Sequence, residues 1–265
     1  MGIIRTDGWL DEDYTAPLKI CTRLSDKFEK EDPRKIYEYL LQFGMYEPNR
    51  QTLKNFEQLK DRRYWEKAES IFKKYKKKWS GPDIPIYIFP LAAKTTFFRS
   101  AQPAKAGVAF KDKLFLFLTP LDDEKELEAL MIHEYHHTCR LNKQNNRLKE
   151  FTLLDSVILE GLAEHAVEEI LGENYIASWC NYYSSEEVSY FWRKFIKPNL
   201  QVKKEHPLHD EILYGRKGFP VMAGYSAGYN IISKYKSKRK FNIEESFNME
   251  ADSFLKIFQN NIRAE

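Results

Sequence analysis

The chain has 265 residues, of which 43% are hydrophobic, 15% aromatic and 31% charged. This composition excludes a disordered protein, because disordered chains lack the apolar and aromatic residues that fill a core. The 42 basic and 39 acidic residues leave a net charge of +3. Such a balance is too small to imply a polyanionic partner, so no nucleic acid is expected to bind.

The cysteines and the N-terminus indicate the compartment. Cys21, Cys139 and Cys180 stand far apart without a CxxC pair, so neither a disulfide framework nor a thiolate zinc site is predicted. The N-terminus has no apolar signal region, and no window approaches about eighteen uninterrupted apolar residues. We therefore expect a cytoplasmic protein with no membrane partner.

The N-terminal part of the chain is predicted to be helical. From about residue 16 to residue 79, apolar residues recur at three- and four-residue steps, and Asp32 before Pro33 is a helix start. The run SGPD at residues 80–83 ends this pattern. We therefore expect residues 1–80 to form an N-terminal helical region.

The pattern then changes to short apolar runs that are typical of strands. Three such runs occur at residues 84–91, 106–110 and 114–118. The last two are close enough to form a hairpin through the short turn KDK. Residues 84 to 118 are therefore predicted to form a small sheet.

A helix is predicted to follow the sheet. Thr119 can cap it, Pro120 suits its first position, and Asp122 completes a capping box. On this helix His133 and His137 are four residues apart, which places them about 40° apart around the axis. Their ring nitrogens can therefore converge on one ion.

The stretch HEYHH at residues 133–137 is an H-E-x-x-H arrangement. Neutral imidazoles from His133 and His137 supply two zinc ligands and leave room for a third protein ligand and a water, whose pKa falls to about 7. Glu134 is close enough to take the proton of that water. The other interpretation is a polar helix face with satisfied histidines. His136 is expected to be peripheral, because pairing it with His133 leaves no standard base.

A second helix is predicted from residue 152 and stops at Gly172. Glu160 lies on this strongly apolar helix, where a buried carboxylate needs a partner, and a metal is such a partner. Glu164, one turn further on, is placed to accept the free N–H of a ligand histidine. The alternative is a solvated acidic stripe, for which the apolar neighbours leave little room.

These two motifs carry a family resemblance. HEYHH followed by LEGLAEH resembles the gluzincin metallopeptidases, and the whole chain resembles the bacterial YjaZ-type family of predicted zinc-dependent proteases through LLQFGMYEPNRQT, SGPDIPIYIFPL and HPLHDEILYG. The resemblance implies that His133, His137 and Glu160 are zinc ligands. It also implies that Glu134 is the general base and that Glu164 is the acid that supports a ligand histidine.

Gluzincin sites usually add a histidine or tyrosine donor that stabilises the oxyanion. The candidates here are His209 and Tyr225, with Tyr229 four residues further on. For the tyrosines, ordinary packing is the other interpretation, because Gly224 and Gly228 permit close helix approach. By the same resemblance, the segment at residues 107–118 could supply a sheet edge that binds an extended peptide, although its apolar residues on both faces equally suit a buried strand.

The sequence thus predicts an α+β fold that is mostly helical, with a small mixed β-sheet next to an H-E-x-x-H zincin helix pair. Residues 81–265 are expected to be a zincin-like catalytic domain that forms one compact unit with residues 1–80. The predicted function is a zinc metallopeptidase that acts on a peptide or protein substrate.

Two other classes of protein stay open. A zinc-stabilised binding or regulatory protein would keep the ligands and need no base, so the presence of Glu134 argues against it. A basic nucleic-acid-binding module would depend on the lysine-rich runs at residues 73–78 and 234–240. The near-neutral total charge weakens that second alternative.

Overall fold

The computed structural model describes residues 1–92, 104–144 and 150–262, with only the backbone for residues 257–262. Packing divides the chain into two compact units, unit 1 (Met1–Thr138) and unit 2 (Cys139–Glu265). The division falls inside one helix, α6 (Lys125–Lys143). The division into residues 1–80 and 81–265 that we expected from the sequence is based on function and not on packing. That division stays a prediction.

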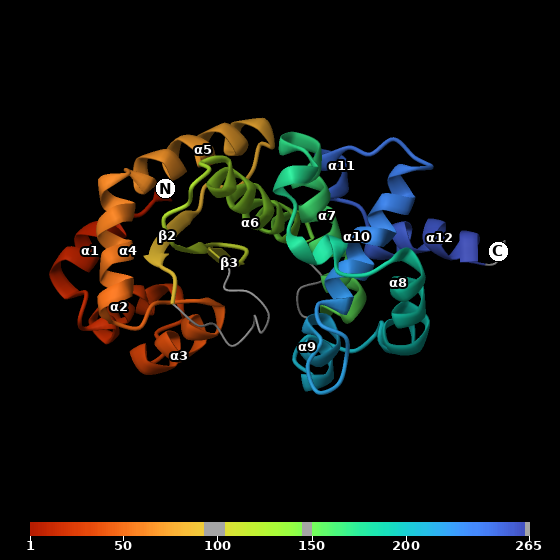
Figure 1. Ribbon diagram of the computed structural model, residues 1–265, viewed down its shortest axis with the longest axis horizontal. Helices are drawn as coiled ribbons and strands as arrows, with labels where there is room; N and C mark the ends of the chain where they lie inside the picture. Colours follow the sequence, from red (N-terminus) through yellow and green to blue (C-terminus); the bar gives the residue numbers. More distant parts are fainter. Residues whose placement is uncertain (93–103, 145–149, 263–265) are drawn as a thin grey trace. The chain divides into compact units, whose positions relative to one another are not determined.

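Unit 1 contains a four-stranded mixed sheet (Figure 1). Its strands lie in the order β1-β2-β4-β3, where β2 runs parallel to β1 and to β4, and β3 runs antiparallel to β4. The α+β class with a small mixed sheet, and the hairpin, are therefore confirmed. The short strand β1 was not predicted, because two residues carry no periodicity. The strands are β1 (Gly2–Ile3), β2 (Pro85–Pro90), β3 (Lys105–Ala109) and β4 (Leu114–Leu118).

The two faces of this sheet differ in chemistry. In β2 and β4 aliphatic and aromatic residues alternate, and the register pairs Ile88 with Leu116 and Tyr87 with Phe115. Since successive side chains point to opposite faces, one face is aliphatic and the other is aromatic. Gly107 of β3 is paired with Leu116 and so belongs to the aliphatic face.

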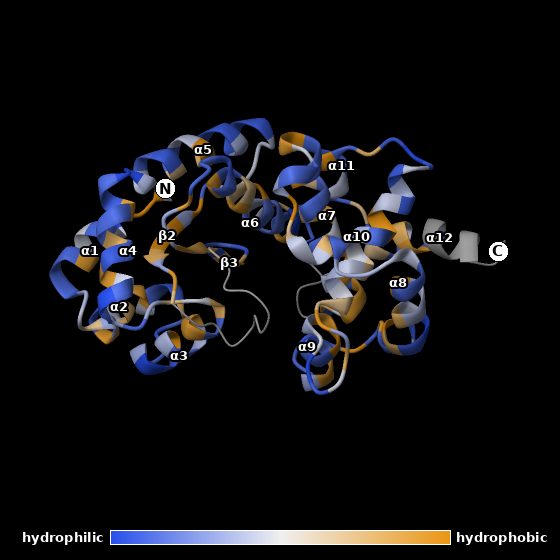
Figure 2. Cartoon of the chain, in the orientation of Figure 1, coloured by the Kyte–Doolittle hydropathy of each residue, from blue (hydrophilic) through white to orange (hydrophobic). Residues whose placement is uncertain are grey.

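Helices cover the sheet of unit 1. The helices predicted between about residues 16 and 79 are confirmed, and Asp32 caps one of them by accepting the backbone N–H of Arg34 at 2.8 Å. Hydrophobic and hydrophilic residues alternate along α4 and α5 (Figure 2), as expected for helices with one buried face. The lysine-rich end of α5 forms exposed ion pairs, such as Lys76 with Asp83 at 2.9 Å. The helices are α1 (Thr6–Asp13), α2 (Pro17–Leu24), the short η1 (Ser25–Lys27), α3 (Pro33–Phe43), α4 (Arg50–Asp61) and α5 (Tyr64–Lys78).

The predicted start of the next helix at Pro120 is wrong, because α6 begins at Lys125. Thr119 does not cap a helix; its backbone N–H and its hydroxyl both donate to the Ala104 carbonyl, each at 2.9 Å, and extend the hairpin. The backbone of Leu121 is held by the hydroxyl of Tyr64, which accepts its N–H at 2.7 Å. These tertiary contacts outweigh the local capping pattern.

Unit 2 is built from helices around α7 (Leu153–Leu171) and α10 (Ala223–Lys236). The predicted second helix is confirmed with its boundaries, because Thr152 forms a capping box with Asp155 and Gly172 ends the helix. No helix within residues 1–92, 104–144 and 150–262 is long and apolar enough to cross a membrane. The other elements are η3 (Glu173–Tyr175), η4 (Ser178–Asn181), α8 (Ser185–Phe191), η5 (Trp192–Ile196), η6 (Lys197–Asn199), α9 (Pro207–Tyr214), α11 (Ile243–Ser246) and α12 (Ala251–Ile262).

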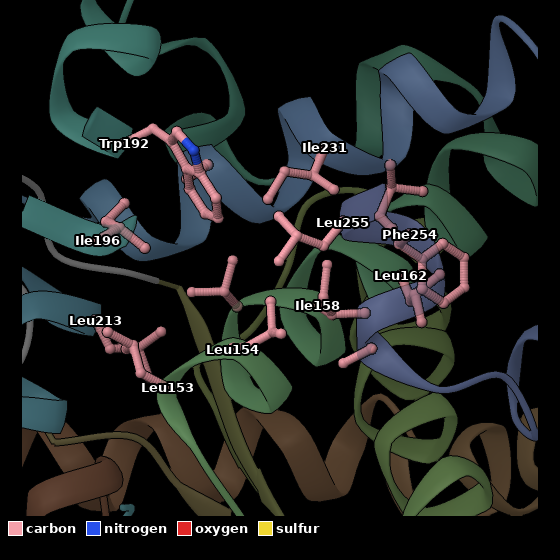
Figure 3. Packing of buried hydrophobic residues seen from close by; sticks show 14 of the residues in the cluster. Leu153, Leu154, Ile158, Leu162, Trp192, Ile196, Leu213, Ile231, Phe254 and Leu255 are labelled. Carbon is pink, nitrogen blue, oxygen red and sulfur yellow. The ribbon is translucent and has the colours of Figure 1, made fainter. Parts of the chain in front are cut away.

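The core of unit 2 lies between α7 and the helices that surround it (Figure 3). Ile158 and Leu162 of α7 meet Ile231 of α10, Trp192 of η5 and Phe254 of α12, and all five are fully buried. Each such side chain contributes about 1.5–3 kcal/mol through burial. The core therefore fixes the helix that carries Glu160.

Two glycines bring α7 and α10 into backbone contact. A Cβ built on Gly228 would lie 2.0 Å from the Val157 carbonyl oxygen, and one built on Gly161 would lie 2.3 Å from the Gly228 carbonyl oxygen. No side chain fits at either position. The expectation that Gly228 permits close helix approach is therefore confirmed, and Gly161, the residue after Glu160, completes the contact.

Candidate metal centre

The first half of the H-E-x-x-H motif is a histidine pair on α6. The Nε2 atoms of His133 and His137 lie 3.1 Å apart, with ring planes at 80°. Two nitrogens bound 2.0–2.1 Å from a tetrahedral zinc ion stand about 3.3 Å apart. The pair therefore fits the spacing of two nitrogen ligands on one ion.

Other side chains of α6 anchor it within unit 1. His136 is fully buried, and its ring meets that of Trp79 edge to face at 6.2 Å. The Tyr135 hydroxyl donates to the Pro82 carbonyl at 2.9 Å. This packing indicates a structural role for His136 and orients the face of α6 that bears the histidine pair.

Glu134, the residue between the two ligand candidates, is only 7% exposed. Its side chain lies against the backbone of β3 at Gly107. Sequence reasoning missed this glycine, although a glycine inside a strand often marks a close approach.

Glu160 and Glu164 lie one turn apart on α7. Glu160 is partly exposed, whereas Glu164 is 3% exposed and accepts the backbone N–H of Ala177. This bond attaches α7 to the segment that leads into η4. The prediction that Glu164 also supports a ligand histidine stays a prediction.

A tyrosine pair stands near Glu160. Burial and then the Glu160 carboxylate raise the pKa of Tyr214 above its usual value, while a hydrogen bond from Tyr225 acts in the opposite direction. The Tyr214 and Tyr225 rings are 5.6 Å apart, and Tyr225 also packs edge-on to Trp179 at 5.1 Å. Tyr214 was not among the predicted site residues, since only the fold brings it near Glu160.

His209 occupies a different environment. It is 1% exposed, and its ring nitrogens bond to the Ser156 hydroxyl and to the Asp210 carboxylate, each at 2.8 Å. The bond to Ser156 joins α9 to α7, while Asp210 lies on α9 itself. The predicted role of His209 as an oxyanion donor stays a prediction, while its contacts show a structural role.

Within the described ranges, one group of three or more histidine, cysteine or acidic residues can hold a metal ion, and it consists of His133, His137 and Glu160. Each residue offers one ligand atom, and these atoms lie within 4.8 Å of one another. Two imidazole nitrogens and one carboxylate oxygen are a donor set that zinc accepts. The molecule is therefore an α+β protein with a candidate zinc site.

The chain belongs to the family described as "Predicted Zn-dependent protease (DUF2268)", whose model matches residues 64–256. The "Uncharacterized protein YjaZ" of Bacillus subtilis strain 168 is 35% identical over 227 residues, which cover 86% of this chain and 87% of that protein. The "Uncharacterized protein YjfC" of the same organism is 22% identical over 138 residues, covering 49% and 46%. No solved structure gives a significant match. The resemblance to the YjaZ-type family of predicted zinc-dependent proteases is therefore confirmed.

Proposed function

We propose that this protein is a zinc-dependent metallopeptidase in which His133, His137 and Glu160 hold the metal. The observation that supports the proposal is that, among the described residues, these three form a group that could hold a metal ion. Three protein ligands leave a fourth position open, which is the pattern of catalytic rather than structural zinc. The family description agrees with this class of activity.

The metal and Glu134 divide the chemistry between them. Zinc bound by three protein ligands polarises a carbonyl and lowers the pKa of bound water to about 7. Glu134 follows the first ligand on α6, so its carboxylate is rotated away from the ligand face and does not compete for the ion. In the proposed reaction it takes a proton from the attacking water and passes it to the leaving amine.

We place the peptide substrate along β3. This strand stands at the end of the sheet order, and four of its five residues are partly exposed. A sheet edge can pair with an extended peptide through backbone hydrogen bonds. Because the same strand contacts Glu134, a peptide paired there would lie close to the proposed base.

Tyr225 is the proposed oxyanion donor. Its ring is partly exposed and packs against Tyr214, which stands near the Glu160 carboxylate. A phenolic O–H aimed at the developing oxyanion would stabilise the transition state. Tyr225→Phe is then expected to lower kcat about 100- to 1000-fold while zinc content is unchanged.

A cytoplasmic setting is part of the proposal. Cys21, Cys139 and Cys180 form no disulfide, and Cys21 and Cys139 are buried. Thiols without disulfides are the rule in reducing compartments.

The proposal is tested with casein labelled to self-quenching, which brightens when cleaved. We expect wild type and Glu134→Gln to bind about one zinc per chain, while Glu134→Gln loses about 100- to 10,000-fold in rate, the usual contribution of a general base. Glu169→Gln, which changes an exposed carboxylate of α7, is the matched control and should behave as wild type. Hydrolysis by zinc-loaded Glu134→Gln at the wild-type rate would contradict the mechanism.

A further inference from the structure

Gly107 stands in the middle of β3 without a conformational reason to be glycine. Its φ lies outside the left-handed region, unlike that of glycines such as Gly44 and Gly172. Any L-residue can therefore adopt its backbone conformation. Since a strand glycine loses more conformational entropy on folding than alanine does, the absence of a side chain here needs another explanation.

The explanation is space for Glu134. A Cβ built on Gly107 would lie 2.5 Å from Cγ, 2.6 Å from Cδ and 2.7 Å from Oε1 of Glu134, and these are its three nearest neighbours. All three distances are far below van der Waals contact. The side chain of Glu134 thus occupies the volume that a residue at position 107 would fill.

The strand cannot slide away from the helix to make room. At one end of β3 the Lys105 ammonium donates to the Glu126 carbonyl at 2.9 Å and pairs with the Glu126 carboxylate at 2.6 Å. Just beyond the other end, the Thr138 hydroxyl donates to the Phe110 carbonyl at 3.0 Å. With β3 fastened to α6 on both sides of Gly107, the group that must move is the Glu134 side chain itself.

We infer that Gly107 is a positioning residue for the carboxylate of Glu134, because its bare backbone supplies the place where that side chain rests. The inference rests on the proposed function in assigning Glu134 the role of base, but the contact itself does not. A methyl group at position 107 displaces the carboxylate without touching any proposed metal ligand. The consequence is a loss of turnover rather than a loss of metal.

The first experiment measures zinc content and hydrolysis of the self-quenched casein by Gly107→Ala. We expect about one zinc per chain, a KM within twofold of wild type and a kcat lowered about 10- to 100-fold, since a displacement near 1 Å costs about that much. The matched control is Gly8→Ala, because a Cβ on Gly8 of α1 meets nothing within 4 Å. A wild-type kcat for Gly107→Ala, or loss of its zinc, would overturn the inference.

The second experiment does not use activity. Gly107→Ala is introduced into wild type and into Glu134→Ala, and the melting temperature Tm is measured for all four proteins. Where the Glu134 side chain is absent the new methyl has room, so replacing glycine should raise Tm by about 1–4 °C. With Glu134 present the same change should lower Tm or leave it unchanged.

Equal Tm shifts in the two backgrounds would show that Glu134 is not the neighbour that matters, and would overturn the inference. If zinc-loaded wild type cleaved no peptide bond, the proposed function would fall. The four-protein comparison would then still decide whether Gly107 sets the position of Glu134.

Discussion

The surface of unit 1 and the interior of unit 2 differ in how their side chains interact. On the surface of unit 1 lie exposed ion pairs, such as Lys76 with Asp83, above a sheet that packs through large apolar side chains. In unit 2 polar groups are buried in pairs, as between Ser156 and His209, and two helices meet through backbone at glycines. As a result, the helix that carries Glu160 has little freedom to adjust. Single substitutions should therefore cost much more in unit 2 than on the surface of unit 1.

The largest effect is expected for Gly228→Ala. The new Cβ would lie 2.0 Å from the Val157 carbonyl oxygen, and a backbone atom cannot rotate away. We expect a loss of about 3 kcal/mol or more in the free energy of unfolding. Urea unfolding measures this loss. Gly8→Ala, the same change in an exposed helix of unit 1, should instead stabilise by about 0.5–1 kcal/mol. Similar losses in the free energy of unfolding for Gly228→Ala and Gly8→Ala would contradict the difference between the two regions.

His209→Ala should rank second. The change empties a buried site and removes the hydrogen bond between the Ser156 hydroxyl and α9, which together should cost about 2–4 kcal/mol. The companion Ser156→Ala removes only the hydrogen bond and should cost about 1–2 kcal/mol. If His209→Ala kept wild-type stability but lost turnover, His209 would be the oxyanion donor rather than a structural residue.

A third prediction concerns acid. The hydrogen bond from His165, with further contributions that include Lys236, lowers the pKa of Glu168 to about 2. A lowered folded-state pKa adds stability that is fully present above the usual value near 4.5 and is lost as the pH falls towards 2. Because Glu168 is partly exposed, we expect about 1–2 kcal/mol. Glu168→Gln should therefore be less stable than wild type at pH 6, and the difference should shrink as the pH falls from about 4.5 and nearly vanish at or below about pH 2, measured by urea unfolding. A difference that grew in acid would contradict this sign.

The smallest effect is expected at the surface of unit 1. Lys76→Ala breaks the exposed pair with Asp83, and exposed pairs contribute about 0–1 kcal/mol. The difference in stability should shrink further in 1 M salt, where the Debye length is about 3 Å. A loss of more than about 2 kcal/mol would show that a substitution on the surface of unit 1 costs as much stability as one in the interior of unit 2.

The same contrast explains what could be predicted from the sequence. The histidine pair was predictable because helical spacing alone places His133 beside His137. The end of α7 was predictable from Gly172, and the structure shows that a local capping box of Thr152 with Asp155 sets its start. The start of α6 was not predictable, because tertiary contacts from Ala104, just before β3, and from α5 hold the residues that resemble a cap.

The remaining site residues depend on the fold. Tyr214 approaches Glu160 only when α9 packs on α7, and no spacing in the sequence records that approach. The contact of Gly107 with Glu134 joins a strand to a helix. Its only sign in the sequence is the glycine at position 107. A glycine inside a predicted strand was the one signal that could have been followed.

The central claim is that His133, His137 and Glu160 hold one zinc ion, and metal content tests it most directly. Elemental analysis should be made on purified wild type, on Glu160→Ala and on Glu169→Ala, the last changing an exposed carboxylate of the same helix. We expect about one zinc per chain in wild type and in Glu169→Ala, and a sharply reduced zinc content in Glu160→Ala. A wild-type protein that binds no zinc after reconstitution, or a Glu160→Ala variant that keeps all of it, would contradict the account.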